Sequence, residues 1–173
     1  MTTLARPSPA VLFTLAPSPL GPLALTWSAG RLTGLHLEGR THLPPESEAW
    51  VEDAGPFAAA LAQLEAYFAG ELRRFDLPLS LPGTPFRQKV WQALREIPYG
   101  ETISYAELAR RVGHPYACRA VGTANGHNPI AVIVPCHRVI AADGTLGGYG
   151  GGLERKAWLL RHEFDVLRLS AQP

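Results

Sequence analysis

The chain has few cysteines, few charged residues and no long apolar run, and each shortage excludes a class of protein. Two cysteines in 173 residues are too few for a disulfide framework, so we predict a reducing compartment, the cytoplasm. No apolar stretch approaches the roughly 20 residues that a membrane-spanning helix needs, so we expect no membrane association. Charged residues make up 18% of the chain and hydrophobic residues 46%, which predicts folded domains with substantial cores.

The net charge of +1 conceals a difference between the two halves. Residues 1–83 carry five Arg against eight Asp and Glu, a net charge of −3, whereas residues 84–173 carry eleven Lys and Arg against seven acidic residues, a net charge of +4. A basic second half favours an anionic partner, although an asymmetry of this size also arises by chance.

The early part of the chain is predicted to form a small sheet. The apolar-rich segments 23–27 and 32–37 flank a Ser-Ala-Gly turn and indicate a β-hairpin, with residues 11–15 as a possible third strand. The following polar segment, residues 38–55, contains two consecutive prolines and is predicted to be a loop.

A helix and a short strand complete the predicted first domain. The helix ends near Gly70, and residues 75–79 alternate as a strand does. The Pro82-Gly83 pair then predicts a boundary between two domains, residues 1–83 and 84–173. The helix is indicated by apolar residues at helical spacing, namely Phe57, Leu61, Leu64 and Phe68.

Helix signals dominate the start of the second half. Thr84 is a typical N-cap with a proline at the first helical position, and Ser104 followed by Glu107 is a capping box that opens a second helix. This helix ends at Gly113, and a third helical segment covers about residues 117–125. Such a pair resembles the helix-turn-helix, whose second helix enters a DNA groove, although most short helix pairs only pack together.

The C-terminal part combines a predicted turn, a glycine-rich loop and a helix. Residues 139–142 run into Asp143-Gly144, which is typical of a hairpin turn. The next segment, residues 147–152, carries Tyr149 as its only side chain. Apolar residues at helical spacing then predict a last helix over residues 153–164.

Within the run Ile-Val-Pro-Cys-His-Arg-Val-Ile, residues 133–140, Cys136 lies beside His137. A thiol with the usual pKa of about 8.5 is mostly protonated at pH 7, so a reactive cysteine needs a base or a positive field. Successive side chains of an extended chain point to opposite sides, so contact between the two requires a bridging water or a local bend. Glu163 in the last helix is a candidate partner that would fix the histidine tautomer.

Three other interpretations stay open from pattern alone. A cysteine between β-branched residues is often a packed core sulfur. The glycine run resembles a phosphate loop, but it has no strict G-x-G-x-x-G frame and follows a hairpin, so we predict no nucleotide cofactor. A zinc site is the third candidate, but its four ligands have no recognised spacing, and we predict no metal: Cys118, His127, Cys136 and His137.

The run around Cys136 resembles the active-site motif of the O6-alkylguanine-DNA alkyltransferases. The resemblance covers about residues 84–165, whereas the first half matches only in its general pattern. Further blocks that match at fitting spacing are Arg119-Ala120-Val121-Gly122, Asn125, Asn128-Pro129, Gly147, Tyr149, Gly151-Gly152, Lys156, Trp158-Leu159-Leu160 and His162-Glu163.

This resemblance implies both a fold and a reaction. The fold would be α/β (α+β), with a small N-terminal α/β domain that holds a short antiparallel sheet and a C-terminal winged-helix-like DNA-binding domain that holds the helix-turn-helix. The reaction would be DNA repair by direct reversal, in which Cys136 irreversibly takes the alkyl group from O6-alkylguanine in double-stranded DNA after base flipping. O4-alkylthymine is a further candidate substrate, and we expect a monomer that needs no cofactor.

Catalytic roles come from the same resemblance. Cys136 would be the nucleophile, His137 would take its proton through a water, and Glu163 would orient His137. Three residues would assist: Asn128 by bracing the turn around the motif, Tyr105 by donating a proton toward the departing guanine, and Lys156 as an electrostatic helper.

The DNA contacts and the alkylguanine pocket are implied in the same way. Arg119 would enter the base stack in place of the flipped nucleotide, because its planar guanidinium both stacks and hydrogen-bonds. The other DNA-binding residues would be Tyr105, Ala120, Gly122 and Asn125. The pocket would be formed by Val134, Pro135, Gly147, Tyr149, Gly150 and Gly151.

Two positions at the pocket depart from the family pattern, and two other functions compete. Gly150 stands where relatives often have serine and Ala131 where some have proline, which predicts a wider pocket that tolerates bulkier alkyl groups.

One alternative is a non-catalytic protein that binds alkylguanine and flags it for another pathway, but such relatives replace the cysteine. The other is a cysteine hydrolase or redox thiol with turnover, which the helix-turn-helix argues against.

Overall fold

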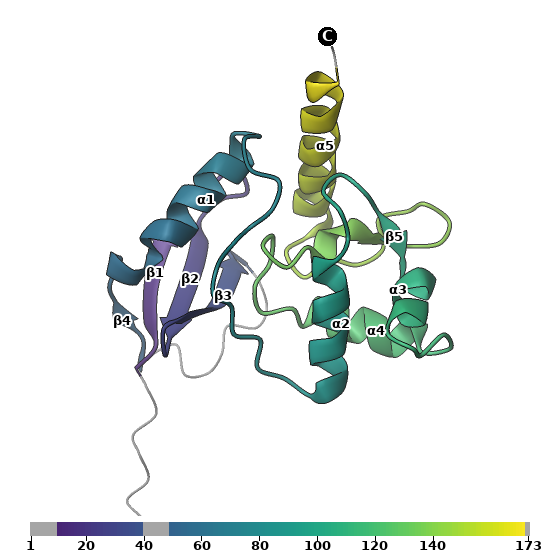
Figure 1. Ribbon diagram of the computed structural model, residues 1–173, viewed down its shortest axis with the longest axis horizontal. Helices are drawn as coiled ribbons and strands as arrows, with labels where there is room; N and C mark the ends of the chain where they lie inside the picture. Colours follow the sequence, from purple (N-terminus) through teal and green to yellow (C-terminus); the bar gives the residue numbers. More distant parts are fainter. Residues whose placement is uncertain (1–9, 40–48, 172–173) are drawn as a thin grey trace, which may run out of the picture.

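The computed structural model describes residues 10–39 and 49–171, with a small sheet on one side and a helical part on the other (Figure 1). The fold is α+β, as predicted. The sheet has the order β3-β2-β1-β4, in which β4 runs parallel to β1 and the other pairs are antiparallel. Its strands are β1 (Leu12–Ala16), β2 (Leu23–Ser28), β3 (Arg31–Leu37) and β4 (Val51–Glu52).

The predicted hairpin and its third strand are confirmed as β2, β3 and β1. Ala29 and Gly30 both have positive φ, 49° and 77°, as a two-residue hairpin turn requires. Leu25 pairs with Leu35 across the hairpin, and both are fully buried, so this face of the sheet points into the core. The loop predicted for residues 38–55 holds β4, while residues 40–48 lie outside the described residues.

Helix α1 (Ala58–Phe68) follows a 3-10 turn, η2 (Gly55–Phe57), and lies along the sheet (Figure 1). It is the predicted amphipathic helix, and it buries Ala60, Leu64 and Tyr67. The strand predicted for residues 75–79 is wrong, because only a single bridge forms there, between Leu32 and Leu79. Pro78 has no N–H to donate, which prevents a longer ladder.

The helical part contains α2 (Pro85–Arg95), α3 (Tyr105–Arg111), α4 (Cys118–Gly126) and α5 (Leu153–Ser170). The Thr84 hydroxyl accepts a hydrogen bond from the Arg87 N–H at the start of α2, which confirms the predicted cap. The Ser104 hydroxyl likewise accepts from the Glu107 N–H, but the Glu107 carboxylate pairs with arginines of α3 instead of turning back to close the box.

The strand after the cysteine motif pairs differently from the prediction. Strand β6 (Val139–Ile140) runs parallel to β5 (Ile103–Ser104) and does not form a hairpin arm. A tight turn does form at the predicted place, because the Asp143 carboxylate accepts from both the N–H and the hydroxyl of Thr145. The glycine-rich loop that follows has Tyr149 as its only side chain, so it has little to pack on a returning strand, and the chain runs directly into α5.

The two parts share one hydrophobic core. The Leu35 N–H donates to the carbonyl of Pro129, and the Ala131 N–H donates to the carbonyl of Leu35, so the edge of β3 joins the segment before Cys136.

In the described part of the chain, no helix is both long enough and apolar enough to cross a membrane.

Candidate active site

Cys136 begins a short 3-10 turn, η3 (Cys136–Arg138), and only 6% of it is exposed. It opens onto a cavity of about 160 Å³, which is smaller than the roughly 300 Å³ at which pockets for drug-sized ligands begin. The cavity is therefore of a size for one small group, on the scale of a nucleobase. Its walls are Leu37, Tyr105, Gly122, Asn125, Gly126, Ala131, Cys136, Gly148, Tyr149, Gly150 and Gly151.

Three of the six residues predicted for the pocket line this cavity, and three do not. Tyr149, Gly150 and Gly151 form one wall. Val134 is fully buried behind the motif, and Pro135 lines a second cavity on another side. Gly147 packs against the Tyr105 ring, where an added Cβ would lie 3.0 Å from a ring carbon, so its small size lets Tyr105 approach the wall.

Asn128 braces the turn before Cys136, as predicted. Its amide donates to the carbonyl of Val134 at 2.7 Å, and its carbonyl oxygen accepts from the Ile130 N–H at 3.0 Å. Between these anchors, Val132 has a φ of 69°, a left-handed conformation that is unfavourable for a β-branched residue. The fully buried Asn128 therefore holds a strained turn that sets the position of the cysteine.

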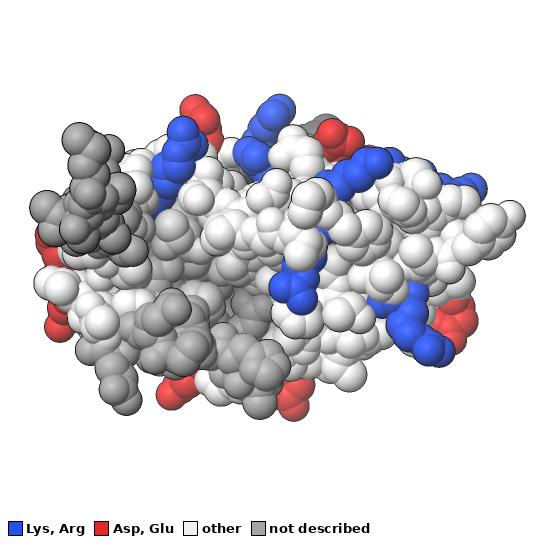
Figure 2. All heavy atoms as spheres, turned by 90° about the horizontal axis from the view of Figure 1, so that it is seen from below, with Lys and Arg blue, Asp and Glu red and all other residues white. Residues whose placement is uncertain are grey.

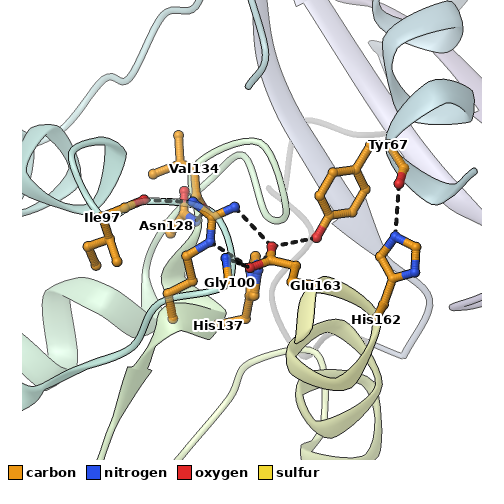
Figure 3. A network of polar contacts seen from close by, with 9 residues as sticks. Tyr67, Ile97, Gly100, Asn128, Val134, His137, His162 and Glu163 are labelled. Carbon is orange, nitrogen blue, oxygen red and sulfur yellow. Dashed lines mark hydrogen bonds and ion pairs between the residues drawn. The ribbon is translucent and has the colours of Figure 1, made fainter. Parts of the chain in front are cut away.

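Behind Cys136, a buried ionic network joins η3 to α5 (Figure 3). His137 Nε2 and Glu163 Oε1 lie 2.7 Å apart, which confirms the predicted pairing across 26 residues of sequence. Arg138 donates to both oxygens of Glu163 at 2.9 Å and to the carbonyl of Ile97 at 2.7 Å. The Gly100 N–H and the Tyr67 hydroxyl complete the set of donors to this carboxylate.

The charge of this network favours a neutral histidine. Burial would raise the pKa of Glu163, but the hydrogen bonds and positive charge of its partners outweigh it and hold that pKa well below the usual range. Burial lowers the pKa of His137 below 6.5, despite the opposing hydrogen bond to Glu163. Because Arg138 already neutralises the carboxylate, a proton on His137 would add an uncompensated buried charge.

His137 has one ring nitrogen available for a proton. Its Nε2 faces Glu163, whereas its buried Nδ1 has no hydrogen-bond partner among the described residues. A buried polar atom left in this way is uncommon and requires an explanation. A neutral imidazole whose Nε2 carries the proton presents Nδ1 as an acceptor.

Lys156 is buried and immobilised, not a surface residue of an amphipathic helix. Its ammonium donates to the backbone carbonyls of Val139, Leu146 and Gly148, so it joins β6 to the glycine-rich loop. Burial lowers the pKa of Lys156 to about 8, and the nearby Cys136 opposes this shift. Its position supports both a structural role in the loop and a positive field near the thiol.

Helix α4 presents predicted residues to two environments. Gly122 and Asn125 line the cavity, and the Asn125 amide donates to the carbonyl of Cys136 at 3.4 Å. Arg119 and Ala120 are exposed near the start of the helix. Tyr105, at the start of α3, lines the cavity, and its hydroxyl donates to the carbonyl of Gly148 at 3.4 Å.

The Tyr105 hydroxyl stays protonated at neutral pH. Burial raises its pKa above 10, and the charge of Cys136 raises it further. A phenol in this state can donate a proton or a hydrogen bond to a group in the cavity.

The zinc candidate is not assembled by this geometry. Cys118 is exposed near the start of α4, whereas Cys136 is buried in η3. His127 Nδ1 hydrogen-bonds to the carbonyl of Thr123. Across residues 10–39 and 49–171, no three His, Cys, Asp or Glu side chains are grouped as metal ligands.

On the face that Figure 2 shows, positive charge lies mostly on the side of the molecule that carries the helical part. On the face in Figure 2, most of the Lys and Arg groups lie from the centre to the right, and the Asp and Glu groups lie mainly at the edges. This distribution agrees with the predicted charge difference between the halves and offers phosphate groups a mildly positive surface.

Sequence reasoning missed three donors to the network and three residues that line the cavity. Tyr67, Arg138 and the Gly100 N–H donate to Glu163. The cavity is also lined by Leu37 at the end of β3, Gly126 and Gly148. Arg138 was visible only as part of the cysteine motif. Nothing in the sequence indicated that Tyr67, 96 residues before Glu163, reaches the carboxylate.

The chain matches two family descriptions that together span most of its length. Residues 11–81 match "6-O-methylguanine DNA methyltransferase, ribonuclease-like domain", and residues 85–164 match "6-O-methylguanine DNA methyltransferase, DNA binding domain". The methylated-DNA--protein-cysteine methyltransferase of Mycobacterium tuberculosis (strain ATCC 25618 / H37Rv) is 57% identical over 146 residues, which cover 84% of this chain and 88% of that protein. Its namesake from Methanosarcina acetivorans is 52% identical over 151 residues, with 84% and 94% covered.

Solved structures give the same result. The crystal structure of the Mycobacterium tuberculosis O6-methylguanine methyltransferase superposes with a TM-score of 0.85 at 52% identity, over 92% of this chain and 99% of that chain. A structure of Mycobacterium tuberculosis OGT in complex with DNA has a TM-score of 0.84 at 53% identity, over 90% and 94%.

Proposed function

The chain belongs to the 6-O-methylguanine DNA methyltransferase family, and from this premise we propose that it repairs DNA by direct reversal, as a methylated-DNA–protein-cysteine methyltransferase. The observation that carries the proposal is the buried thiol of Cys136, which opens onto a base-sized cavity bordered by α4. The buried His137–Glu163 pair behind the thiol supplies a base for its proton.

The chemical step is one displacement at carbon. The Cys136 proton passes through a water to Nδ1 of His137, which is a neutral acceptor because burial lowers its pKa. The thiolate attacks the alkyl carbon, a sulfur–carbon bond forms, and the bond between that carbon and O6 of guanine breaks. Tyr105 donates a proton or hydrogen bond to the departing guanine, and Lys156 holds the adjoining loop and stabilises the thiolate.

The product explains why each molecule acts once. A thioether has no good leaving group, and no second nucleophile among the residues lining the cavity is placed to remove the alkyl group. The buried sulfur also explains why the base must leave the duplex, since O6 cannot reach a thiol that is 6% exposed while the base is stacked. Arg119 fills the vacancy, and Ala120, Gly122 and Asn125 lie along the helix that approaches the DNA.

The organisation of the molecule is part of the proposal. The boundary between the domains lies at residue 83, which is supported by family matches that end at 81 and resume at 85. The protein acts as a cytoplasmic monomer without a cofactor. The alternative, a damage flag without transfer, is disfavoured by the presence of Cys136.

The transfer of one alkyl group per molecule is the direct test. Duplex DNA with radiolabelled O6-methylguanine is incubated with the protein, and label on the protein is counted. We expect one label per wild-type molecule and none for Cys136→Ser, whereas Cys118→Ser, which changes an exposed thiol, should behave as wild type. Tight DNA binding without label would support the damage flag, and repeated turnover would contradict a suicide reaction.

A second prediction concerns the size of the alkyl group. Gly150 and Ala131 both line the cavity, and a serine at position 150 would fill part of it. We expect Gly150→Ser to slow benzyl transfer about tenfold relative to methyl transfer, because overpacking a cavity costs about 1–3 kcal/mol. Rates for the two adducts in the same duplex give the ratio, with methyl transfer as the internal control. An unchanged ratio would show that position 150 does not limit alkyl size. Ala131→Pro is a poorer test, since Ala131 also donates its N–H to Leu35.

A further inference from the structure

The carboxylate of Glu163 receives hydrogen bonds from both parts of the molecule (Figure 3). Oε2 accepts from the Gly100 N–H and from Arg138 Nε, each at 2.9 Å. Oε1 accepts from Arg138 and His137 and also from the Tyr67 hydroxyl at 2.7 Å. Gly100, His137 and Arg138 belong to the C-terminal half. Tyr67 belongs to α1, the helix that covers the N-terminal sheet.

We propose that Tyr67 is a positioning residue for alkyl transfer, through which the N-terminal half holds Glu163 in the orientation that pairs with His137. The inference rests on the proposed function, because the pair matters only if His137 takes the Cys136 proton. It assigns the N-terminal half a direct effect on the chemistry. The Tyr67 hydroxyl bonds to Oε1 of Glu163, and the same oxygen bonds to Nε2 of the His137 ring, whose other nitrogen is Nδ1.

The position of the Tyr67 hydroxyl is fixed by its surroundings. The fully buried ring packs with centroid distances of 5.3 Å to Phe68, 5.3 Å to Phe75 and 6.0 Å to Tyr99. Its own backbone carbonyl accepts a 2.9 Å hydrogen bond from His162, the residue before Glu163. Tyr67 thus contacts two neighbouring residues of α5. Its backbone carbonyl bonds to His162, and its hydroxyl bonds to Glu163.

The electrostatic effect of this bond has a definite sign. Burial raises the pKa of the Tyr67 hydroxyl well above 10, so it remains a donor at every pH of interest. Its hydrogen bond withdraws charge from Oε1, the oxygen that faces His137. Without the bond, Oε1 would stabilise a protonated imidazole more strongly, and the pKa of His137 would rise. The other charged or titratable groups near this pair are Tyr99 after α2, Cys136 and Arg138 in η3, and Lys156 and His162 in α5.

The test compares two variants that each lose one hydroxyl from the same cluster. Tyr67→Phe removes the donor to Glu163 and keeps the ring packing. Tyr99→Phe is the matched control, because the buried Tyr99 hydroxyl has no hydrogen-bond partner among the described residues. Second-order transfer rates are measured from pH 5 to pH 9, with methylated duplex DNA and with free O6-benzylguanine, at a temperature where thermal denaturation shows each variant to be folded.

We expect Tyr67→Phe to slow transfer about threefold to tenfold on both substrates near pH 7, with unchanged DNA affinity. The fall in rate on the acidic side should move to higher pH, because His137 gains a proton more easily. Tyr99→Phe should retain the wild-type rate and pH profile. Equal losses in both variants, or a Tyr67→Phe rate and profile identical to wild type, would overturn the inference. If wild-type protein takes up no label, the proposed function itself fails, so the two failures are distinguishable.

Discussion

Replacing Glu163 by glutamine is expected to cost the folded state about 3–5 kcal/mol and to slow alkyl transfer at least about 100-fold. The substitution keeps the shape of the side chain but removes the charge that Arg138 and His137 face in a fully buried site. The groups around the carboxylate all donate to it, so the new amide N–H₂ either faces another donor or donates to Nε2 of the other His137 tautomer, whose Nδ1 is protonated and cannot accept the Cys136 proton. The histidine then loses the acceptor that fixes its tautomer, and proton transfer from Cys136 slows.

The free energy of unfolding at low pH offers a separate check of the Glu163→Gln substitution. The pKa of Glu163 is lowered in the folded protein, so its contribution is complete above the usual value of 4.5 and is lost as the pH falls through the folded value. The pKa of His137 is also lowered in the folded protein, so the free energy of unfolding decreases as the pH falls below 6.5. Urea denaturation at several pH values should show that Glu163→Gln is less stable at pH 7 but loses less stability between pH 4.5 and lower pH. A parallel loss in both proteins would contradict the lowered pKa of Glu163.

Removing the Arg119 side chain is expected to impair repair in duplex DNA about 100-fold while leaving the reaction with free O6-benzylguanine unchanged. Flipping costs a few kcal/mol of unstacking, and a residue that fills the vacancy offsets about 2–3 kcal/mol of it. Arg119 is exposed near the start of α4, and no described contact ties it to the cavity, so its loss should not disturb the thiol. Rates with the two substrates separate flipping from chemistry.

Arg119→Lys provides the control for charge. Lysine keeps the attraction to phosphate but lacks the planar group that stacks and hydrogen-bonds. We expect it to bind DNA nearly as well as wild type and still to repair slowly. Equal losses of Arg119→Ala on duplex DNA and on the free base would contradict a role in flipping, as would full recovery by lysine.

The sequence predicted those parts of the molecule that local pattern determines. The caps at Thr84 and Ser104 and the hairpin turn at Ala29-Gly30 depend on neighbouring residues, so each could be found from a short window. The pairing of His137 with Glu163 could be inferred because a motif resemblance supplied the partner across a long separation.

The predictions from sequence were wrong or incomplete where tertiary contacts determine the structure. Only one bridge forms in the strand predicted for residues 75–79, because Pro78 has no N–H to donate to a neighbouring strand. Strand β6 pairs with β5 because the glycine-rich segment after its turn has only the Tyr149 side chain to pack. Lys156 on an amphipathic pattern gave no sign that three backbone carbonyls would bury it. Tyr67 occupies an ordinary core position of its helix, and only the docking of the two halves brings its hydroxyl to a carboxylate.

Leu37 lies at the end of β3, yet it forms part of the wall against which an alkyl group would rest. A side chain added at Gly151 would overlap it, so the loop and the strand fit each other without spare room. We therefore expect residues of both halves of the chain to influence which alkyl adducts the cavity accepts. If two relatives exchange their N-terminal halves and keep every residue of the cysteine motif, we expect the ratio of methyl to benzyl transfer rates to change.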